Sequence, residues 1–157
     1  KVYEDPLTRV YNRRYLDEFI YLYKNNDEVA KHIGFIMADL SKFKEINDLL
    51  GHDIGDRILI EVAATLKEHI EPSDSVIRMG GDEFVIVLAN YTKEMIVARM
   101  ELLRKEVNKI CYNEQEQSYV IVDMGYSYTE AFKTTKEFVD QMLKEADESM
   151  YLMKKHI

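Results

Sequence analysis

Hydrophobic and polar positions along the chain follow two different spacings. Short, continuous apolar runs occupy positions 33–38 and 84–88, and they predict two buried strands, the first of which ends at Asp39. A further strand is predicted just before the second run, at 75–79, and a fourth at 119–122, continuing toward Tyr128. The pattern therefore predicts four strands.

Apolar residues that recur every three or four positions predict amphipathic helices between these strands. A shorter helix is predicted over 42–50, with Gly51 as its C-cap and Asp53 as the N-cap of the helix that follows. The first helix is expected to end at Asn25-Asn26-Asp27. The four longer helices have their apolar positions within 16–23, 54–70, 96–110 and 139–153. One α+β domain, a mainly antiparallel sheet with helices packed on it, is the simplest arrangement.

The stretch RMGGDEFVIVL, residues 78–88, places two glycines and two acids before an apolar run. Gly80 and Gly81 are expected to supply the positive φ of a tight hairpin turn. Adjacent residues on a regular strand face opposite sides, so Asp82 and Glu83 reach one site only if the turn includes one or both of them. Acids beside a turn are also common as merely solubilising residues.

Composition and charge narrow the possible partners. The chain has 157 residues, is 46% hydrophobic and carries a net charge of −8, which argues against a nucleic-acid backbone or an anionic membrane as partner. A polyanionic ligand would need a local cation, and a metal ion is the obvious candidate. The single cysteine, Cys111, excludes a disulfide within the chain. No apolar run is long enough to cross a bilayer, and no signal peptide is visible in the sequence, which starts at Lys1 rather than Met. We therefore expect a cytosolic domain from a longer protein.

Three acids stand at the ends of predicted strands. Asp39 follows one strand, and Asp82 and Glu83 begin another. If these strands are neighbours, the three carboxylates converge at one end of the sheet. Mg²⁺ prefers hard oxygen ligands and usually takes one or two carboxylates together with phosphate oxygens, and paired metals stabilise phosphoryl-type transfer.

Polar residues are dense over 39–56, in the stretch DLSKFKEINDLLGHDIGD. Asp56 is a candidate for accepting the N1–H and N2–H of guanine, and the amide of Asn47 for meeting its remaining polar atoms. The alternatives are a helix-surface amide and a first-turn acid favoured by the helix dipole. Lys44 and Lys154 are candidate phosphate contacts, although lone lysines on helices are usually only solvated.

Four motifs follow one another along the chain: DPLTRVYNRR (5–14), DLSKFKEINDLLGHDIGD (39–56), GGDEF (80–84) and EADESMYLMKK (145–155). In this order they resemble the GGDEF domains, the diguanylate cyclases of bacterial signalling. The resemblance implies a fold like polymerase palms and class III nucleotidyl cyclases, with a central, mostly antiparallel sheet surrounded by helices. It implies one GGDEF domain over 1–157, cut from a multidomain signalling protein. That parent protein could be membrane-anchored through other regions, whereas the domain itself would be cytoplasmic and make no membrane contact.

The resemblance also implies a reaction and its requirements. Two GTP molecules condense to cyclic di-GMP with release of two pyrophosphates. Each domain of a homodimer holds one GTP, and each 3′-hydroxyl attacks the α-phosphate of the other nucleotide. Two Mg²⁺ or Mn²⁺ ions per active site are expected.

Individual roles follow from the matching positions of the motifs. Asp39 and Glu83 resemble the metal ligands, helped by the carbonyl of Leu40. Asp82 resembles the acid that helps to deprotonate the 3′-hydroxyl or holds the second metal, so Asp82 and Glu83 are the expected catalytic acids. The resemblance assigns guanine binding to Asn47 and Asp56, and phosphate binding to Phe43, Lys44 and Lys154.

The chain departs from the family pattern at several positions. Ser41 stands where a second acid is usual, which would weaken indirect support of the metal. Glu71-Pro72-Ser73-Asp74 replaces the Arg-x-x-Asp inhibitory motif, so no feedback site for cyclic di-GMP is expected. Arg9-Val10 replaces Gly-Leu in the first motif. Asp123 falls near a usual serine, with no explanation from the sequence, and the chain ends at Ile157, before the family's closing Gly-Arg-Asn.

Two functions of different kinds remain open. One is an active diguanylate cyclase, and the retained acids favour it. The other is a catalytically silent domain that binds GTP or a partner protein and regulates a neighbour. Asp56 favours GTP, because variants that make adenine-containing dinucleotides replace this aspartate. A fragment of a polymerase palm fits poorly, because the chain is acidic and shows no basic groove in its sequence.

Overall fold

A computed structural model describes residues 2–24 and 31–155 of the chain. The predicted end of the first helix, at Asn25-Asn26-Asp27, lies outside the described residues. In these ranges no helix combines the length and the apolar character that a membrane span requires. The elements, in order, are α1 (Tyr15–Lys24), β1 (Ile33–Leu40), α2 (Phe43–Leu50), α3 (His52–Glu68), β2 (Ser75–Arg78), β3 (Glu83–Ala89), α4 (Lys93–Val107), β4 (Cys111–Asn113), β5 (Ser118–Tyr119), β6 (Val122–Thr129) and α5 (Lys136–Lys155).

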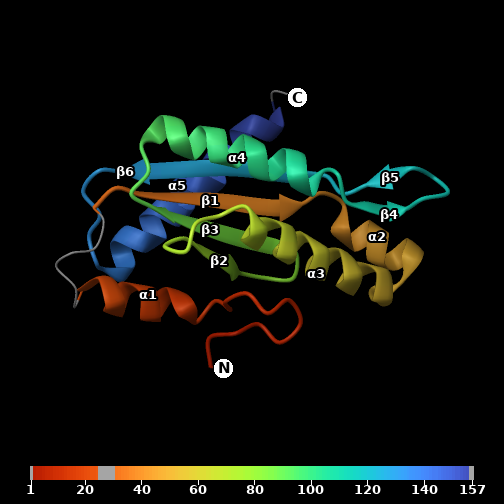
Figure 1. Ribbon diagram of the computed structural model, residues 1–157, viewed down its shortest axis with the longest axis horizontal. Coiled ribbons are helices and arrows are strands. Elements are labelled where there is room, and N and C mark those ends of the chain that lie inside the picture. The colour runs from red at the N-terminus through yellow and green to blue at the C-terminus, as the bar shows by residue number, and fades with distance from the viewer. Residues whose placement is uncertain (1, 25–30, 156–157) are drawn as a thin grey trace.

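The main sheet has four strands in the order β2-β3-β1-β6, and all three of its strand pairs are antiparallel. This confirms the expected α+β fold with a mostly antiparallel sheet. β1 lies in the interior of the sheet and is almost entirely buried, as its continuous apolar run predicted. The carboxyl end of β1 leads directly to α2 (Figure 1).

Helices cover both faces of the sheet (Figure 1). On one face Ile36 and Phe84 pack with the apolar stripes of α3 and α4. On the other, Phe35 and Val85 pack with α1 and α5. The faces alternate because successive strand side chains point in opposite directions. The side chains at the odd-numbered positions of β1 therefore lie on the side of α5.

The fourth strand of the main sheet begins later in the sequence than predicted. It starts at Val122, and the residues before it form a separate two-stranded hairpin of β4 and β5. Val120 is buried and donates its N–H to the carbonyl of Ile110 (2.8 Å), while the carbonyl of Ile121 accepts from the N–H of Ser41 (2.8 Å). These residues have strand-forming side chains, but their backbone bonds go to loops rather than to a strand.

The turn glycines do not act as predicted. Among the described glycines only Gly51 has a positive φ, so the expected positive φ at Gly80 and Gly81 is wrong. The turn is closed by the N–H of Met79, which donates to the carbonyl of Glu83 (2.8 Å). The guanidinium of Arg78 also donates to the carbonyls of Gly80 (3.2 Å) and Gly81 (2.9 Å). A Cβ at Gly80 would lie 3.2 Å from Oε1 of Glu83, so this glycine leaves room for a carboxylate.

A single residue, Gly51, separates α2 from α3, whereas the sequence predicted that α3 begins after Asp53. Gly51 ends α2 with φ 95°, and its N–H donates to the carbonyl of Asn47 (2.8 Å). Gly51 is also the residue before α3, which begins at His52 without a side-chain cap. Asp53 is therefore not the N-cap but a residue of the first turn, where its charge still favours the helix dipole.

α5 crosses β6 at very close range. A Cβ added to Gly125 would clash with the backbone nitrogen of Met150 and would lie 2.5 Å from the carbonyl oxygen of Ala146. Both obstacles are backbone atoms, which cannot move aside as a flexible side chain can. The contact fixes how far along the strand α5 is placed.

Arg9→Gly is expected to raise the free energy of unfolding by about 0.5–1 kcal/mol, because Arg9 has φ 69° in the left-handed region that penalises a Cβ. The ion pair lost with Glu4 is exposed, since the Arg9 side chain is 73% accessible, and contributes little. Urea denaturation measures the change. Arg13→Gly, at an exposed position without a positive φ, is the control and should destabilise. A larger loss for Arg9→Gly than for Arg13→Gly would contradict the explanation.

Candidate functional site

Three carboxylates lie side by side across the sheet at the end of β1. Asp39 is paired with Glu83 on β3 and with Asp123 on β6. Directly paired residues of antiparallel strands point to the same face. That face is the one covered by α5, because Phe35 and Met37, which precede Asp39 at alternate positions, belong to its core. The sheet therefore brings Asp39 and Glu83 together, as predicted, and adds Asp123.

Asp82 joins this group from the turn rather than from a strand. It lies just before β3, and its carbonyl accepts a hydrogen bond from the N–H of Leu40 (3.1 Å). This bond ties the turn to the end of β1. Because Asp82 is outside the regular strand, the alternation of strand side chains does not force it to face away from Glu83.

The pKa of Asp39 reflects its burial and the negative charges around it. Burial, followed by the negative charge of Asp82, raises the pKa of the Asp39 carboxyl from 3.8 to about 6. The ammonium of Lys154 opposes this rise, whereas Glu83 and Asp123 add to it. A bound cation would relieve the same repulsion, so the site favours a positive charge at this position.

Lys154 supplies a positive charge there in the structure. Its Nζ lies 3.5 Å from Oδ2 of Asp123 and 3.8 Å from Oδ2 of Asp39. The sequence nominated Lys154 as a phosphate contact but gave no role to Asp123. The position of Asp123 beside Asp39 could have been recognised only from the strand order, which places β6 next to β1.

The residues present suit a hard divalent cation. Within the described ranges, no three His, Cys, Asp or Glu side chains form a group that could hold a metal ion by themselves. Mg²⁺ needs only one or two protein carboxylates when phosphate oxygens complete its coordination. Asp39 and Glu83, on adjacent strands, offer this pair of oxygen ligands. The donor set thus fits magnesium bound together with a nucleotide.

The candidate base-reading residues lie on α2 and α3. Asn47 is half-buried, and its Oδ1 is a buried atom without a hydrogen-bond partner among the described residues. Gly55 lies against this amide, since a Cβ there would clash with Oδ1. Asp56 follows and is exposed. An unpaired buried acceptor is costly, so Asn47 is suited to a ligand that supplies the missing donor.

The three candidate phosphate contacts, Phe43, Lys44 and Lys154, lie in different surroundings. Phe43 is buried and begins α2, whose first backbone N–H groups lack helical partners. Lys44 has an 87% accessible side chain and pairs with Asp48 of the next turn (3.9 Å). Lys154 therefore lies beside the carboxylates at the end of β1, whereas Lys44 pairs with Asp48 on its own helix.

If Asn47 reads the base of GTP, as the sequence predicts, Gly55→Ala should weaken GTP binding about tenfold and reduce the preference for GTP over ATP, because the added Cβ displaces the Asn47 amide. The free energy of unfolding should change little, since alanine also favours the helix by about 1 kcal/mol. Calorimetric titration with each nucleotide measures the effect. Ala64→Ser, exposed on the same helix, is the control, and unchanged GTP binding by Gly55→Ala would contradict the role of Asn47.

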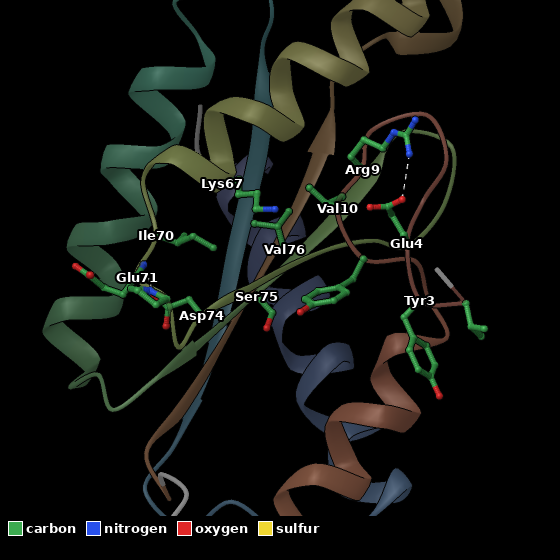
Figure 2. Close-up of a pocket in the computed structure, with 13 residues that line it drawn as sticks. Tyr3, Glu4, Arg9, Val10, Lys67, Ile70, Glu71, Asp74, Ser75 and Val76 are labelled. Atoms are coloured by element: carbon green, nitrogen blue, oxygen red, sulfur yellow. Dashed lines mark hydrogen bonds and ion pairs between the residues drawn. The ribbon is translucent and has the colours of Figure 1, made fainter.

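A separate groove of about 560 Å³ lies between the N-terminal segment and the end of α3 (Figure 2). Its walls include Lys67, Val76 and the Glu4–Arg9 ion pair, but none of the clustered acids. Asp74 also lines it, and it is the residue that the resemblance aligns with the aspartate of the inhibitory motif.

Both oxygens of the Asp74 carboxylate accept hydrogen bonds inside the protein. It accepts hydrogen bonds from the N–H of Glu71 (2.9 Å), the N–H of Ala89 (3.1 Å) and the hydroxyl of Tyr91 (2.7 Å). Asp74 is 8% exposed and acts as a cap for this turn. Glu71 stands in place of the inhibitory arginine and brings a negative charge. The absence of a cyclic di-GMP site here stays a prediction.

Comparison with known proteins agrees with this geometry. The family model described as diguanylate cyclase, GGDEF domain, matches residues 2–157. The chain is 31% identical over 155 residues to diguanylate cyclase DosC of Escherichia coli, and 32% identical over 154 residues to response regulator PleD of Caulobacter vibrioides. Each match covers 96% of this chain and 33% of the relative. The chain thus spans about a third of the length of these relatives.

Solved structures share the fold. Diguanylate cyclase SiaD of Pseudomonas aeruginosa, solved with its activator SiaC, gives a TM-score of 0.84 at 27% identity, covering 98% of this chain and 58% of SiaD. The GGDEF domain of DgcB from Caulobacter crescentus, solved with c-di-GMP, gives 0.82 at 21% identity, covering 99% and 92%. The motif order, the palm-like sheet and the match over nearly the whole length lead to one conclusion: the chain belongs to the GGDEF domain family.

Proposed function

We propose that this domain is a diguanylate cyclase that condenses two GTP into cyclic di-GMP and releases two pyrophosphates. The observation that carries the proposal is the row of carboxylates at the end of β1, where Asp39 is paired with Glu83 and the turn containing Asp82 is bonded to Leu40. A site of this kind suits the positioning and charge neutralisation that phosphoryl-type transfer requires.

The three acids have different roles in the proposed reaction. Asp39 and Glu83, with the carbonyl of Leu40, would hold Mg²⁺ or Mn²⁺, with two ions per active site. The bound metal neutralises the triphosphate and polarises the phosphorus–oxygen bonds. Asp82 accepts the proton of the attacking 3′-hydroxyl or helps to hold the second ion. The amides at Phe43 and the ammonium groups of Lys44 and Lys154 bind the phosphate oxygens.

The base is selected by two side chains. The carboxylate of Asp56 accepts the N1–H and N2–H of guanine, and Asn47 meets the remaining polar edge of the base. Adenine lacks these donors and would leave the carboxylate unpaired. The buried, unpaired Oδ1 of Asn47 is an acceptor, so it suits the second N2–H of guanine, which Asp56 leaves free.

Turnover requires two copies of the domain. Each copy binds one GTP, and the two α-phosphates and 3′-hydroxyls meet between the copies, so a homodimer is the active form. We place the domain in the cytoplasm, where GTP is available. The net charge of −8 supports a partner other than nucleic acid or an anionic membrane.

Product analysis tests the proposal. The domain, at high concentration, is incubated with GTP and Mg²⁺, and the products are separated by chromatography. We expect cyclic di-GMP from the wild type and from Glu61→Ala, an exposed control on α3, but not from the double variant Asp82→Ala, Glu83→Ala. The rate should rise more steeply than in proportion to protein concentration, because two copies must meet.

Two outcomes would overturn the assignment. Product from the double variant would remove the acids from the reaction. No product from a wild-type domain fused to a dimerising coiled coil, with GTP still bound, would leave the silent regulatory domain as the function.

A further inference from the structure

We propose that Asp123 is a positioning residue that holds the ammonium of Lys154 over the end of β1, within reach of the nucleotide phosphates. The inference rests on the proposed function for the nucleotide, but the ion pair itself does not. Nζ of Lys154 lies closer to Asp123 (3.5 Å) than to Asp39 (3.8 Å). Asp123 is therefore the nearer of its two partners.

The backbone explains why these two residues meet. Gly125 lies two residues after Asp123 on the same face of β6, and Met150 lies one helical turn before Lys154 on α5. The close approach of Gly125 to the backbone of Met150 fixes one point of contact. From that point, two strand residues cover about 7 Å and four helix residues about 6 Å. The distance from Gly125 to Asp123 along β6 therefore nearly equals the distance from Met150 to Lys154 along α5. This match places Lys154 next to Asp123.

The surroundings strengthen the pair beyond an ordinary surface contact. The Asp123 side chain is 17% exposed and that of Asp39 26%, whereas Lys154 is 40% exposed. Partly desolvated charges interact more strongly than fully solvated ones. An ammonium has three N–H donors, so two carboxylates leave one donor for a third acceptor. A phosphate oxygen can therefore bind Lys154 without displacing Asp123.

Asp123 has a role that Asp39 cannot perform throughout the reaction. Asp39 is proposed to give its oxygens to the metal, and this reduces its attraction for Lys154. Asp123 is on the far side of Asp39 from Glu83, so it remains as the partner of the lysine. Without Asp123, the long side chain of Lys154 would have to be ordered at the moment of nucleotide binding, which lowers affinity.

A double-mutant cycle on nucleotide binding tests the role. The probe is 3′-deoxy-GTP with Mg²⁺, which lacks the attacking hydroxyl, and its Kd is measured by calorimetry. We expect Asp123→Asn to weaken binding about three- to tenfold in the wild type and to have no effect beside Lys154→Gln. Asp123→Glu, which keeps the charge, should restore binding. An equal loss with and without Lys154, or tighter binding by Asp123→Asn, would overturn the proposal.

A second measurement needs no nucleotide. The metal-free domain is treated briefly with the N-hydroxysuccinimide ester of acetic acid, and acetylation of Lys154 is measured by mass spectrometry relative to Lys144, an exposed lysine of the same helix. We expect Asp123→Asn to speed acetylation of Lys154 several-fold and Asp123→Glu to restore the slow rate. An unchanged rate would overturn the ion pair in solution. Failure of every variant to bind 3′-deoxy-GTP would instead overturn the proposed function, with the acetylation result still deciding the ion pair.

Discussion

Asp39→Asn is expected to lower the rate of cyclic di-GMP formation by at least about two orders of magnitude while making the metal-free domain more stable. The loss of activity follows from the removal of a proposed anionic metal ligand at the end of β1. The gain in stability follows from the pKa of Asp39, which burial and the charge of Asp82 raise to about 6. An ionised Asp39 is therefore unfavourable in the folded, metal-free protein.

The stability of the metal-free domain should depend on pH through the ionisation of Asp39. The folded-state pKa of Asp39 is about 6, and its value without these neighbours is 3.8. Between these values the folded protein binds more protons than the unfolded chain, so stability falls as the pH rises from about 4 to 6. Asp39→Asn should remove this loss, raising the free energy of unfolding by about 1 kcal/mol at pH 8, since solvent screens part of the repulsion. Below pH 4 it should give no such gain.

Thermal unfolding without metal, at pH 4 and pH 8, measures this prediction beside the activity assay. A gain of about 1 kcal/mol corresponds to roughly 2–4 °C for a domain of this size. Asp147→Asn, exposed on α5, removes one negative charge elsewhere and is the control. If Asp147→Asn stabilised equally at pH 8, the gain would reflect net charge and not the crowding at Asp39.

Gly125→Ala is expected to lower the free energy of unfolding by about 2–3 kcal/mol or more. The added Cβ would meet the backbone of Met150 and Ala146, so α5 must move away from β6. Chemical denaturation measures the loss. The same variant should speed acetylation of Lys154, because the helix that carries this lysine is displaced.

Two other glycines provide controls for this prediction. A Cβ added to Gly81 would meet no atom within 4 Å, and Gly81 has no positive φ, so Gly81→Ala should be nearly neutral for stability. Gly34 faces side-chain atoms of Ile96 rather than backbone, and the end of a side chain shifts more easily than backbone even in the buried core, so Gly34→Ala should fall between the two. A Gly125→Ala protein as stable as Gly81→Ala would show that α5 is not held at this point.

Local patterns in the sequence predicted most elements of the fold. The apolar runs that form β1 and β3 and the helical spacings of α3, α4 and α5 are recognisable because burial on one or both faces leaves a direct mark on residue type. The prediction that the fourth strand of the main sheet starts at 119 was wrong. Tyr119 belongs to the separate strand β5, and Val120 and Ile121 have strand-like side chains but bond to loop residues. The residue types of a segment do not show whether its backbone bonds to a strand or to a loop.

The site was predictable to the extent that its residues belong to motifs. Asp39, Asp82 and Glu83 were nominated from their places at strand ends, and strand pairing brings Asp39 and Glu83 together. Asp123 was not explained, because its meaning depends on β6 lying next to β1, from which it is far removed along the chain. The glycines of the turn were correctly placed but for the wrong reason, since their φ values are not positive.

The position of β1 between two partner strands has a consequence for the motions of the site. Backbone amides of a central, buried strand exchange with solvent only when a large part of the protein opens. The acids at the end of β1 are therefore attached to the slowest-exchanging part of the domain. α2, whose only buried residue is Phe43, should exchange much faster. Nucleotide binding should then slow exchange mainly in α2, which carries Asn47, one of the two proposed base-reading residues, and leave β1 almost unchanged.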